Sequence, residues 1–235
     1  MYEFKIELAE TSVEVVALCE STQALCTDYF TDKPAKLRIV MNEDDIEKER
    51  TFATSKSPSR QDLEFMALYR KICSELAKKD IVLMHGSSIS VDGQGYVFCA
   101  PSGTGKSTHT RLWRQYLGDR AVMINDDKPL LRICNDSVRI YGTPWNGKHR
   151  LGNNMSAPLK SICFLNRSFS NAIKKVDNKD CFPLLLEYIF RPEDPALLID
   201  VLNTITKITY LCDFWSLECN MDLNAAEVSF SAMSA

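Results

Sequence analysis

The sequence has no long hydrophobic run. None of its apolar stretches approaches the roughly 20 residues that a membrane-spanning helix needs, so no membrane partner is expected. The N-terminal segment MYEFKIELAE also lacks the charged-then-apolar pattern of a secretory leader. Both absences predict a cytoplasmic protein.

An excess of charge of one sign is also missing. The sequence contains 28 lysines and arginines against 31 aspartates and glutamates, which gives a formal net charge of -3. Nucleic-acid-binding domains normally carry a clear positive charge on the face that meets the nucleic acid. The charge balance therefore gives no support for a nucleic-acid partner.

The nine cysteines include no CxxC pair. Their number is odd, and Cys73, Cys99 and Cys163 lie inside apolar runs. Buried thiols in such runs are typical of proteins from reducing compartments. Neither a disulfide framework nor a zinc site is expected.

The rest of the composition is that of an ordinary globular protein, with 45% hydrophobic and 25% charged residues. The length fits one core with an added lobe. Residues 1–60 are interpreted as a β-rich N-terminal lobe that ends in a polar linker at Asn42–Ser59, and residues 61–235 as the main core. The strands predicted in the lobe are Tyr2–Leu8, Ser12–Leu18 and Leu37–Met41.

The core alternates between strand and helix patterns, which predicts an α/β fold. The predicted helices are Arg60–Lys79 with Ser59 as its cap, Lys106–Tyr116 ended by Gly118, Phe182–Ile189, a helix that opens at Pro195, and Asp222–Ala232. The predicted strands are Ile81–Met84, Ser87–Val91, Tyr96–Ala100, Ala121–Asn125, Leu130–Cys134, Val138–Tyr141, Leu159–Leu165 and Phe214–Cys219.

The most specific motif is Ala100-Pro-Ser-Gly-Thr-Gly-Lys-Ser-Thr108. It matches the phosphate-binding loop, a glycine followed by four residues and Gly-Lys-Ser/Thr, except that Ala100 replaces the first glycine. A predicted strand precedes the motif and a predicted helix follows it, which is the context this loop requires. A chance Gly/Ser loop is the alternative, and the strand–helix junction argues against it.

The residue types in this motif suit the binding of a nucleotide. Gly103 and Gly105 allow the backbone to curl so that its N–H groups point at phosphate oxygens. Lys106 is expected to reach the β- and γ-phosphates, and the Ser107 hydroxyl to bind Mg²⁺. The expected nucleotide-binding residues are Ser102, Gly103, Thr104, Gly105, Lys106, Ser107 and Thr108.

Two adjacent carboxylates, Asp126 and Asp127, follow the predicted strand Ala121–Asn125. In enzymes with a phosphate-binding loop, an acidic residue at a strand end holds Mg²⁺. A second carboxylate allows one of the pair to lie near the metal while the other accepts a proton from an incoming hydroxyl. A solvated turn is the alternative interpretation.

The segment from Gly142 to Pro158 has neither strand nor helix periodicity, and loops of this length are often functional. Lys148, His149 and Arg150 lie in it, close to Trp145, and are candidates to neutralise charge on the γ-phosphate or the substrate. A solvated basic turn remains open.

Two single residues are weaker candidates. His85 follows a short predicted strand, and a catalytic role competes with an ordinary structural one. Arg191 follows the helix predicted at Phe182–Ile189. It is either a further contact of the substrate or a charge at a helix C-terminus.

Several of these motifs resemble one family in order and spacing. They are Met84-His85-Gly86, the hairpin through Gly93 and Gly95, the loop Ser102–Ser107 and the pair Asp126-Asp127. They resemble the catalytic domain of HPr kinase/phosphorylase and, more widely, the kinase core of ATP-dependent phosphoenolpyruvate carboxykinase, whose loop also contains Ser-Gly-Thr-Gly-Lys. The resemblance covers roughly residues 81–166 and does not extend to residues 1–60.

The resemblance implies a phosphate-loop core with a mixed β-sheet and flanking helices, and a kinase that uses ATP and Mg²⁺. It implies that His85 lies near the transferred phosphoryl group, that Asp127 is the general base, and that Asp126 and Ser107 hold the metal. The implied acceptor is a hydroxyl, above all a serine of a protein or peptide, with a small-molecule hydroxyl as the alternative. Related kinases assemble, so a homo-oligomer is an open expectation.

The sequence departs from the pattern of this family in one place, which bears on the identity of the phosphoryl acceptor. HPr kinase/phosphorylases carry a metal-binding glutamate near an Arg-Gly-x-Gly-type signature, whereas Tyr141–Arg150 contains no carboxylate. This argues against HPr itself as the acceptor and against the reverse, phosphorylase reaction. Two rival functions stay open: an ATP-binding regulatory module without transfer, and simple ATP hydrolysis. The presence of Lys106, Ser107 and Asp127 favours transfer, because a sensor needs no base.

Overall fold

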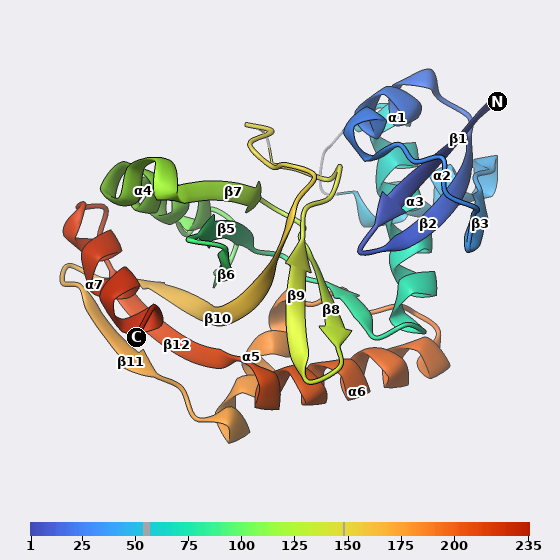
Figure 1. The fold of residues 1–235 in the computed structure, drawn as a ribbon. Helices are drawn as coiled ribbons and strands as arrows, with labels where there is room; N and C mark the ends of the chain where they lie inside the picture. The colour runs from blue at the N-terminus through green and yellow to red at the C-terminus, as the bar shows by residue number, and fades with distance from the viewer. Residues whose placement is uncertain (54–56, 148) are drawn as a thin grey trace.

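The computed structural model describes residues 1–53, 57–147 and 149–235. The chain forms a mixed α/β protein, in which a small N-terminal sheet lies beside a large curled sheet that carries helices (Figure 1). This confirms the predicted α/β class and the β-rich N-terminal part. Within the described residues, no helix combines the length and the apolar character needed to cross a membrane.

The small sheet has three strands in the order β1-β2-β3. β1 (Tyr2–Leu8) and β2 (Thr11–Ala17) form an antiparallel hairpin, and β3 (Leu37–Val40) runs parallel to β2. The short helix α1 (Glu20–Leu25) and the 3₁₀ turn η1 (Thr27–Tyr29) lie in the connection from β2 to β3. The alternating pattern of the sequence predicted each strand to within one residue at either end.

The polar segment Asn42–Ser59, which the sequence predicted as a linker, contains a helix in its first part, and residues 54–56 of it lie outside the described residues. Residues Glu43–Phe52 form helix α2. Its start is fixed by a capping box, in which Asn42 Oδ1 accepts the Asp45 N–H at 3.0 Å and Asp45 Oδ2 accepts the Asn42 N–H at 2.9 Å. Only Ile46 and Glu49 of α2 are buried. Because the rest of the helix is mostly charged, the sequence shows no apolar periodicity there.

Helix α3 (Arg60–Ala77) joins the two sheets. The Ser59 hydroxyl accepts the Asp62 N–H at 3.1 Å, as the sequence predicted for the helix start. The buried stripe of α3, which includes Leu68, Ile72 and Leu76, lies in one hydrophobic cluster with side chains of both sheets. Burial along this stripe is what holds the N-terminal sheet against the rest of the chain.

The large sheet has nine strands and is built around β10 (Ser156–Arg167). The first residues of β10 pair antiparallel with β9, and the later ones pair parallel with β6 (Gln94–Cys99) on one side and β12 (Asp213–Cys219) on the other. The carboxyl ends of β6, β10 and β12 therefore lie at the same edge. The other strands are β4 (Ile81–Leu83), β5 (Ser87–Val91), β7 (Ala121–Asn125), β8 (Leu130–Cys134), β9 (Ser137–Tyr141) and β11 (Ala172–Lys175).

Two pairs of helices cover the large sheet (Figure 1). α4 (Lys106–Leu117) and α7 (Asn224–Met233) pack together in one cluster, where the Ser229 hydroxyl accepts the Trp113 indole N–H at 2.8 Å. α5 (Asn178–Tyr188) and α6 (Pro195–Leu211) pack in a second cluster, and the short turn η2 (Gly118–Arg120) follows α4. The sequence predicted these four helices, and it missed α1 and the edge strand β11.

Candidate functional site

The phosphate-loop motif lies where the sequence predicted it, between the end of β6 and the start of α4. Gly103 has a φ of 77° and Gly105 a φ of 130°, conformations that side-chain-bearing residues rarely adopt. No atom lies within 4 Å of a Cβ built on either glycine, so the space beside the loop is open. The loop thus has the backbone form and the free space that an anion requires.

The side chain of Lys106 folds back toward Ala100, at the start of the phosphate loop. Its ammonium donates a hydrogen bond of 2.8 Å to the carbonyl oxygen of Ala100, and the residue is only 8% exposed. Burial lowers the pKa of the Lys106 ammonium, and the nearby charge of Asp127 opposes that shift. A phosphate group that enters the loop would give this cation a charged partner in place of a neutral carbonyl.

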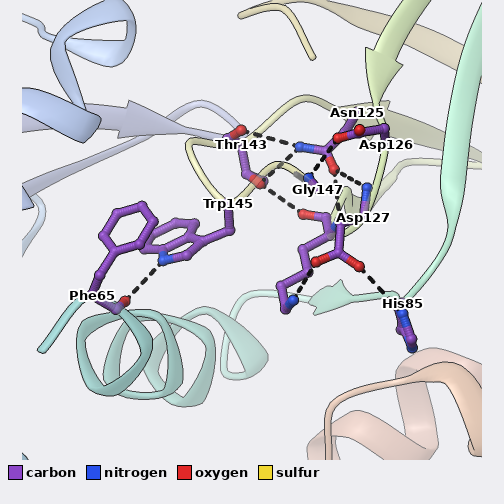
Figure 2. Close-up of polar contacts among 9 residues, drawn as sticks. Phe65, His85, Asn125, Asp126, Asp127, Thr143, Trp145 and Gly147 are labelled. Atoms are coloured by element: carbon purple, nitrogen blue, oxygen red, sulfur yellow. Dashed lines mark hydrogen bonds and ion pairs between the residues drawn. The ribbon is translucent and has the colours of Figure 1, made fainter. Parts of the chain in front are cut away.

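The acidic pair follows β7, and its two carboxylates have different surroundings (Figure 2). Asp126 is 4% exposed, and its Oδ1 accepts the Gly147 N–H at 2.6 Å. Asp127 Oδ1 lies 3.2 Å from His85 Nε2, and its Oδ2 accepts from the Lys128 ammonium. Burial of Asp127 favours the protonated form, but His85 and Lys128 outweigh it and lower the pKa to about 2.

Asn125, the last residue of β7, orients the pair (Figure 2). Its Oδ1 accepts the backbone N–H groups of Asp127 at 2.9 Å and Lys128 at 2.6 Å. Its Nδ2 donates to the carbonyl and the hydroxyl of Thr143, each at 3.1 Å. This amide therefore ties the turn that carries the acidic pair to the segment after β9. The sequence pattern gave no sign of it.

Most of the predicted site residues line a single pocket of about 510 Å³, which we call the loop pocket. Its lining includes His85, both aspartates and His149, which come from three separate segments of the chain, after β4, β7 and β9. The remaining lining residues are Ser102, Gly103, Gly105, Lys106, Ser107, Thr108 and Gly147. Thr104 lines a neighbouring pocket instead, which it shares with the loop glycines.

Other predicted residues lie elsewhere. Trp145 is 3% exposed, stacks on Phe65 with 5.2 Å between ring centroids, and donates its indole N–H to the Phe65 carbonyl at 2.9 Å (Figure 2). It is a core residue and does not line the loop pocket. Arg150 is exposed and does not line the pocket either, and Lys148 lies outside the described residues.

Arg191 lies in a different pocket. That pocket, about 340 Å³ in volume, is formed by α2, α3 and the segment after α5, and it shares no residue with the loop pocket. The structure therefore places Arg191 away from the residues of the loop pocket. Arg191 follows helix α5, which ends at Tyr188.

Lys128 and Arg167 are site residues that sequence reasoning missed. Lys128 pairs with Asp127, as described above. The Arg167 guanidinium, at the end of β10, donates to the carbonyl oxygens of Gly103 and Thr104, the latter at 3.1 Å. These bonds give the two loop carbonyls a cationic partner within the protein. Lys128 adjoins the acidic pair in sequence and so could have been noticed, whereas Arg167 lies 63 residues from Thr104.

The described residues contain no group of three or more His, Cys, Asp or Glu side chains that could hold a metal ion by themselves. Mg²⁺ does not need such a group, because it is usually bound by one or two carboxylates together with phosphate oxygens and water. The oxygens of Ser107 and Asp126 border the loop pocket and are ligands of the kind that Mg²⁺ prefers. These residues therefore fit a Mg²⁺–nucleotide complex.

Comparison with known proteins gives a distant likeness to solved structures and none to a family model or a curated protein. Among solved structures, the Hpr(Ser) kinase/phosphatase from Coxiella burnetii is similar, with 13% sequence identity and a TM-score of 0.29 over 55% of this chain and 97% of that chain. A TM-score this low does not establish a shared fold or a shared activity.

Proposed function

We propose that this protein is a Mg²⁺- and ATP-dependent kinase with a phosphate-loop core of the HPr kinase and phosphoenolpyruvate carboxykinase type. In this proposal it transfers the γ-phosphoryl group to a hydroxyl, above all a serine of a protein or peptide. One observation carries the proposal: Lys106, Asp126, Asp127 and His85 border the same pocket as the glycine-rich loop. A chance match to the loop motif gives no reason for these groups to meet there.

The nucleotide phosphates bind along the loop. Backbone N–H groups between Gly103 and Thr108 hold the phosphate oxygens, and the start of α4 adds partial positive charge. Lys106 leaves the Ala100 carbonyl and binds the β- and γ-phosphates. Ser107 and Asp126 hold Mg²⁺, which, when bound, neutralises charge on the β- and γ-phosphates.

Asp127 acts on the acceptor hydroxyl. The acceptor oxygen forms a bond to the γ-phosphorus while the bond from that phosphorus to the β–γ bridging oxygen breaks, and ADP leaves. The hydroxyl proton moves to the Asp127 carboxylate. A pKa of about 2 makes this carboxylate a weak base, which suits a loose transition state in which the proton moves late. His85 and Lys128 hold the carboxylate in place.

The acceptor enters from the side of His85. A hollow of about 230 Å³, the acceptor-side hollow, shares His85 with the loop pocket and is also lined by Lys128, Tyr69 and Tyr188. Its aromatic and charged lining suits either a side chain of a polypeptide or a small polar alcohol. A small-molecule hydroxyl is therefore the second candidate acceptor.

The first experiment measures unfolding with and without Mg·ATP. A ligand at 100 times its Kd stabilises the fold by about 2.7 kcal/mol, and we expect this for the wild type and for Asp127→Asn. Lys106→Ala should lose the gain. Lys207→Ala, which removes an exposed lysine of α6 paired with Asp80, is the matched control and should keep it. No stabilisation of the wild type at millimolar Mg·ATP would contradict the proposal.

The second experiment separates transfer from binding and hydrolysis. ADP release is measured with and without a degenerate mixture of serine-containing peptides, and with glycerol as a small alcohol. A kinase releases ADP faster when an acceptor is present, and Asp127→Asn should abolish that increase. Binding without ADP release would instead indicate a regulatory module, and release that no acceptor alters would indicate simple hydrolysis.

A further inference from the structure

The acceptor-side hollow continues into the pocket that contains Arg191. It shares His85 with the loop pocket at one end, and it shares Arg70 and Phe190 with the Arg191 pocket at the other. We call the Arg191 pocket, which has a volume of about 340 Å³, the distal pocket. The three hollows therefore form a continuous path from the proposed site of phosphoryl transfer to the distal pocket.

The chain leaves helix α5 as an extended segment that forms one wall of this path. Ile189 has extended φ and ψ angles, and Pro192 disfavours a helical backbone at Arg191, the residue before it. The segment begins beside His85, whose N–H donates to the Tyr188 carbonyl at 2.6 Å. Because an extended chain advances about 3.3 Å per residue, Arg191 lies about 10 Å further along the wall.

Most of the charged side chains in the distal pocket are already paired. Three cations of the pocket form ion pairs with acids of the same pocket: Lys48 with Glu193, Arg70 with Glu49, and Lys71 with Asp45. A fourth acid, Glu75, pairs with Lys78. Arg191 is exposed and forms no ion pair with any residue that the structure describes. The distal pocket therefore has a cation available for an acidic ligand.

Apolar surface lies beside these charges. The Arg70 Cζ atom lies 4.6 Å from the centroid of the Phe52 ring and 5.9 Å from that of Phe190. Phe52 is 41% exposed, whereas Ile39 and Ala67, which also line the pocket, are buried. Exposed aromatic surface next to a cation suits a side chain that has both an aliphatic part and a charged end.

We propose, on the basis of the proposed kinase function, that the acceptor is a polypeptide and that the distal pocket binds one of its acidic side chains. The acceptor serine lies beside Asp127, its chain crosses the acceptor-side hollow, and the acidic side chain meets Arg191. About three residues of extended chain span the same 10 Å as the wall, so the acid lies about three residues from the serine. A small alcohol at His85 cannot reach this pocket.

Arg191 is thus a residue that determines specificity and does not touch the reacting groups. The test uses synthetic peptides with one serine among neutral residues, and a glutamate placed three residues before or after it. Matched peptides carry glutamine or lysine at that position. ADP release gives kcat and KM for the wild type, Arg191→Ala and Arg191→Glu. Arg38→Ala, which removes an exposed arginine of β3 that lines none of the three hollows, is the matched control.

For the wild type and Arg38→Ala, we expect glutamate on one side of the serine to raise kcat/KM about fivefold over glutamine. The gain should lie in KM, because the contact is the same in the ground state and the transition state. Arg191→Ala should use the glutamate and glutamine peptides equally well, and Arg191→Glu should prefer lysine. Mg·ATP should stabilise all four proteins equally, since the distal pocket shares no residue with the loop pocket.

Three results would overturn the inference and leave the kinase function standing. They are equal kcat/KM for the glutamate and glutamine peptides, a preference for glutamate that persists in Arg191→Ala, and ADP release that glycerol raises and no peptide raises. If neither the peptides nor glycerol raises ADP release, the kinase function fails and the inference fails with it.

Discussion

Gly147 has no side chain, and this leaves room for the Asp126 carboxylate to lie against its backbone. A Cβ on Gly147 would come within 2.9 Å of Asp126 Oδ2 and 3.2 Å of Oδ1, closer than real Cβ atoms normally approach. The same residue donates its N–H to that carboxylate at 2.6 Å. The backbone of Gly147 therefore fixes the position of the Asp126 carboxylate, which is the proposed ligand of Mg²⁺.

Gly147→Ala should weaken Mg·ATP binding, because the added methyl group displaces the Asp126 carboxylate. We expect a loss of about 1–3 kcal/mol in unfolding free energy and a smaller stabilisation by Mg·ATP. Denaturant unfolding with and without the ligand measures both. Gly95→Ala is the control, since its Cβ would meet Ile140 at 2.6 Å and Gly95 lies near the start of β6, the end away from the phosphate loop. It should lower stability without changing the ligand effect.

His109 predicts a pH dependence of stability. Burial lowers its pKa from the ordinary 6.5 to about 4, so the folded protein keeps the ring neutral while the unfolded chain takes up a proton below pH 6.5. The contribution of His109 to the free energy of unfolding is therefore fully present above pH 6.5, and it is lost as the pH falls toward 4. Between pH 7.5 and pH 5 the expected loss from this residue is about 2 kcal/mol.

Urea unfolding of the wild type and His109→Gln at the two pH values tests this. Glutamine cannot take up a proton, so the variant should lose about 2 kcal/mol less than the wild type between pH 7.5 and pH 5. Equal losses in both proteins would show that His109 is not the group responsible.

At the scale of the element, α2 shows how a charged segment becomes a helix. Its helix propensity is ordinary, and its sequence of acids and bases resembles a solvated connection. The capping box at Asn42 and Asp45 satisfies backbone groups that would otherwise be free, and the Asp45 carboxylate also accepts from Lys71 of α3 at 2.7 Å. Arg60 and Arg70 of α3 also form ion pairs with Glu43 and Glu49. Local capping, these ion pairs and the burial of Ile46 together select the helix.

Asn42→Ala should destabilise the protein by about 1 kcal/mol, because it removes the side-chain acceptor of the capping box. Asp44→Ala lies in the same first turn but outside the box, so its loss should be only a few tenths of a kcal/mol. Urea unfolding compares the two. An equal or larger loss for Asp44→Ala would mean that the charge of the first turn, and not the cap, holds the helix.

At the scale of the whole molecule, one hydrophobic cluster crosses the boundary that the sequence placed near residue 60. It contains buried side chains of the small sheet, such as Ile6 and Val15, together with Leu83, Leu130 and Trp145 from the other part of the chain. Removing the small sheet would take away part of the apolar surface that buries this cluster. The two parts therefore depend on each other for burial.

Hydrogen exchange should show that both sheets open together. We expect amides of β2 and of the central strand β10 to have the same free energy of exchange, within about 1 kcal/mol, because the shared cluster couples their unfolding. The parallel pairing of β10 with β6 and β12 provides slowly exchanging amides for the comparison. A clearly lower value for β2 would mean that residues 1–60 open as a separate lobe.

The sequence by itself determined the parts of this protein that depend on neighbours along the chain. The β6–loop–α4 unit and the acidic pair at the end of β7 were predicted because each is a continuous segment with a local signal: strand or helix periodicity, a glycine-rich motif, or adjacent carboxylates at a strand end. The strands of the small sheet follow from alternation alone. These signals are local because backbone conformation is decided within a few residues.

Only the tertiary structure decided which of these segments meet. It buries Trp145 against Phe65, 80 residues away, places Arg191 in a separate pocket, and brings Arg167 to the carbonyls of the phosphate loop. The strand β11 exists because β12 offers it an edge, since its own four residues carry little pattern. Such contacts depend on the packing of the whole chain, in which burial is shared among distant residues, and no short stretch of sequence encodes it.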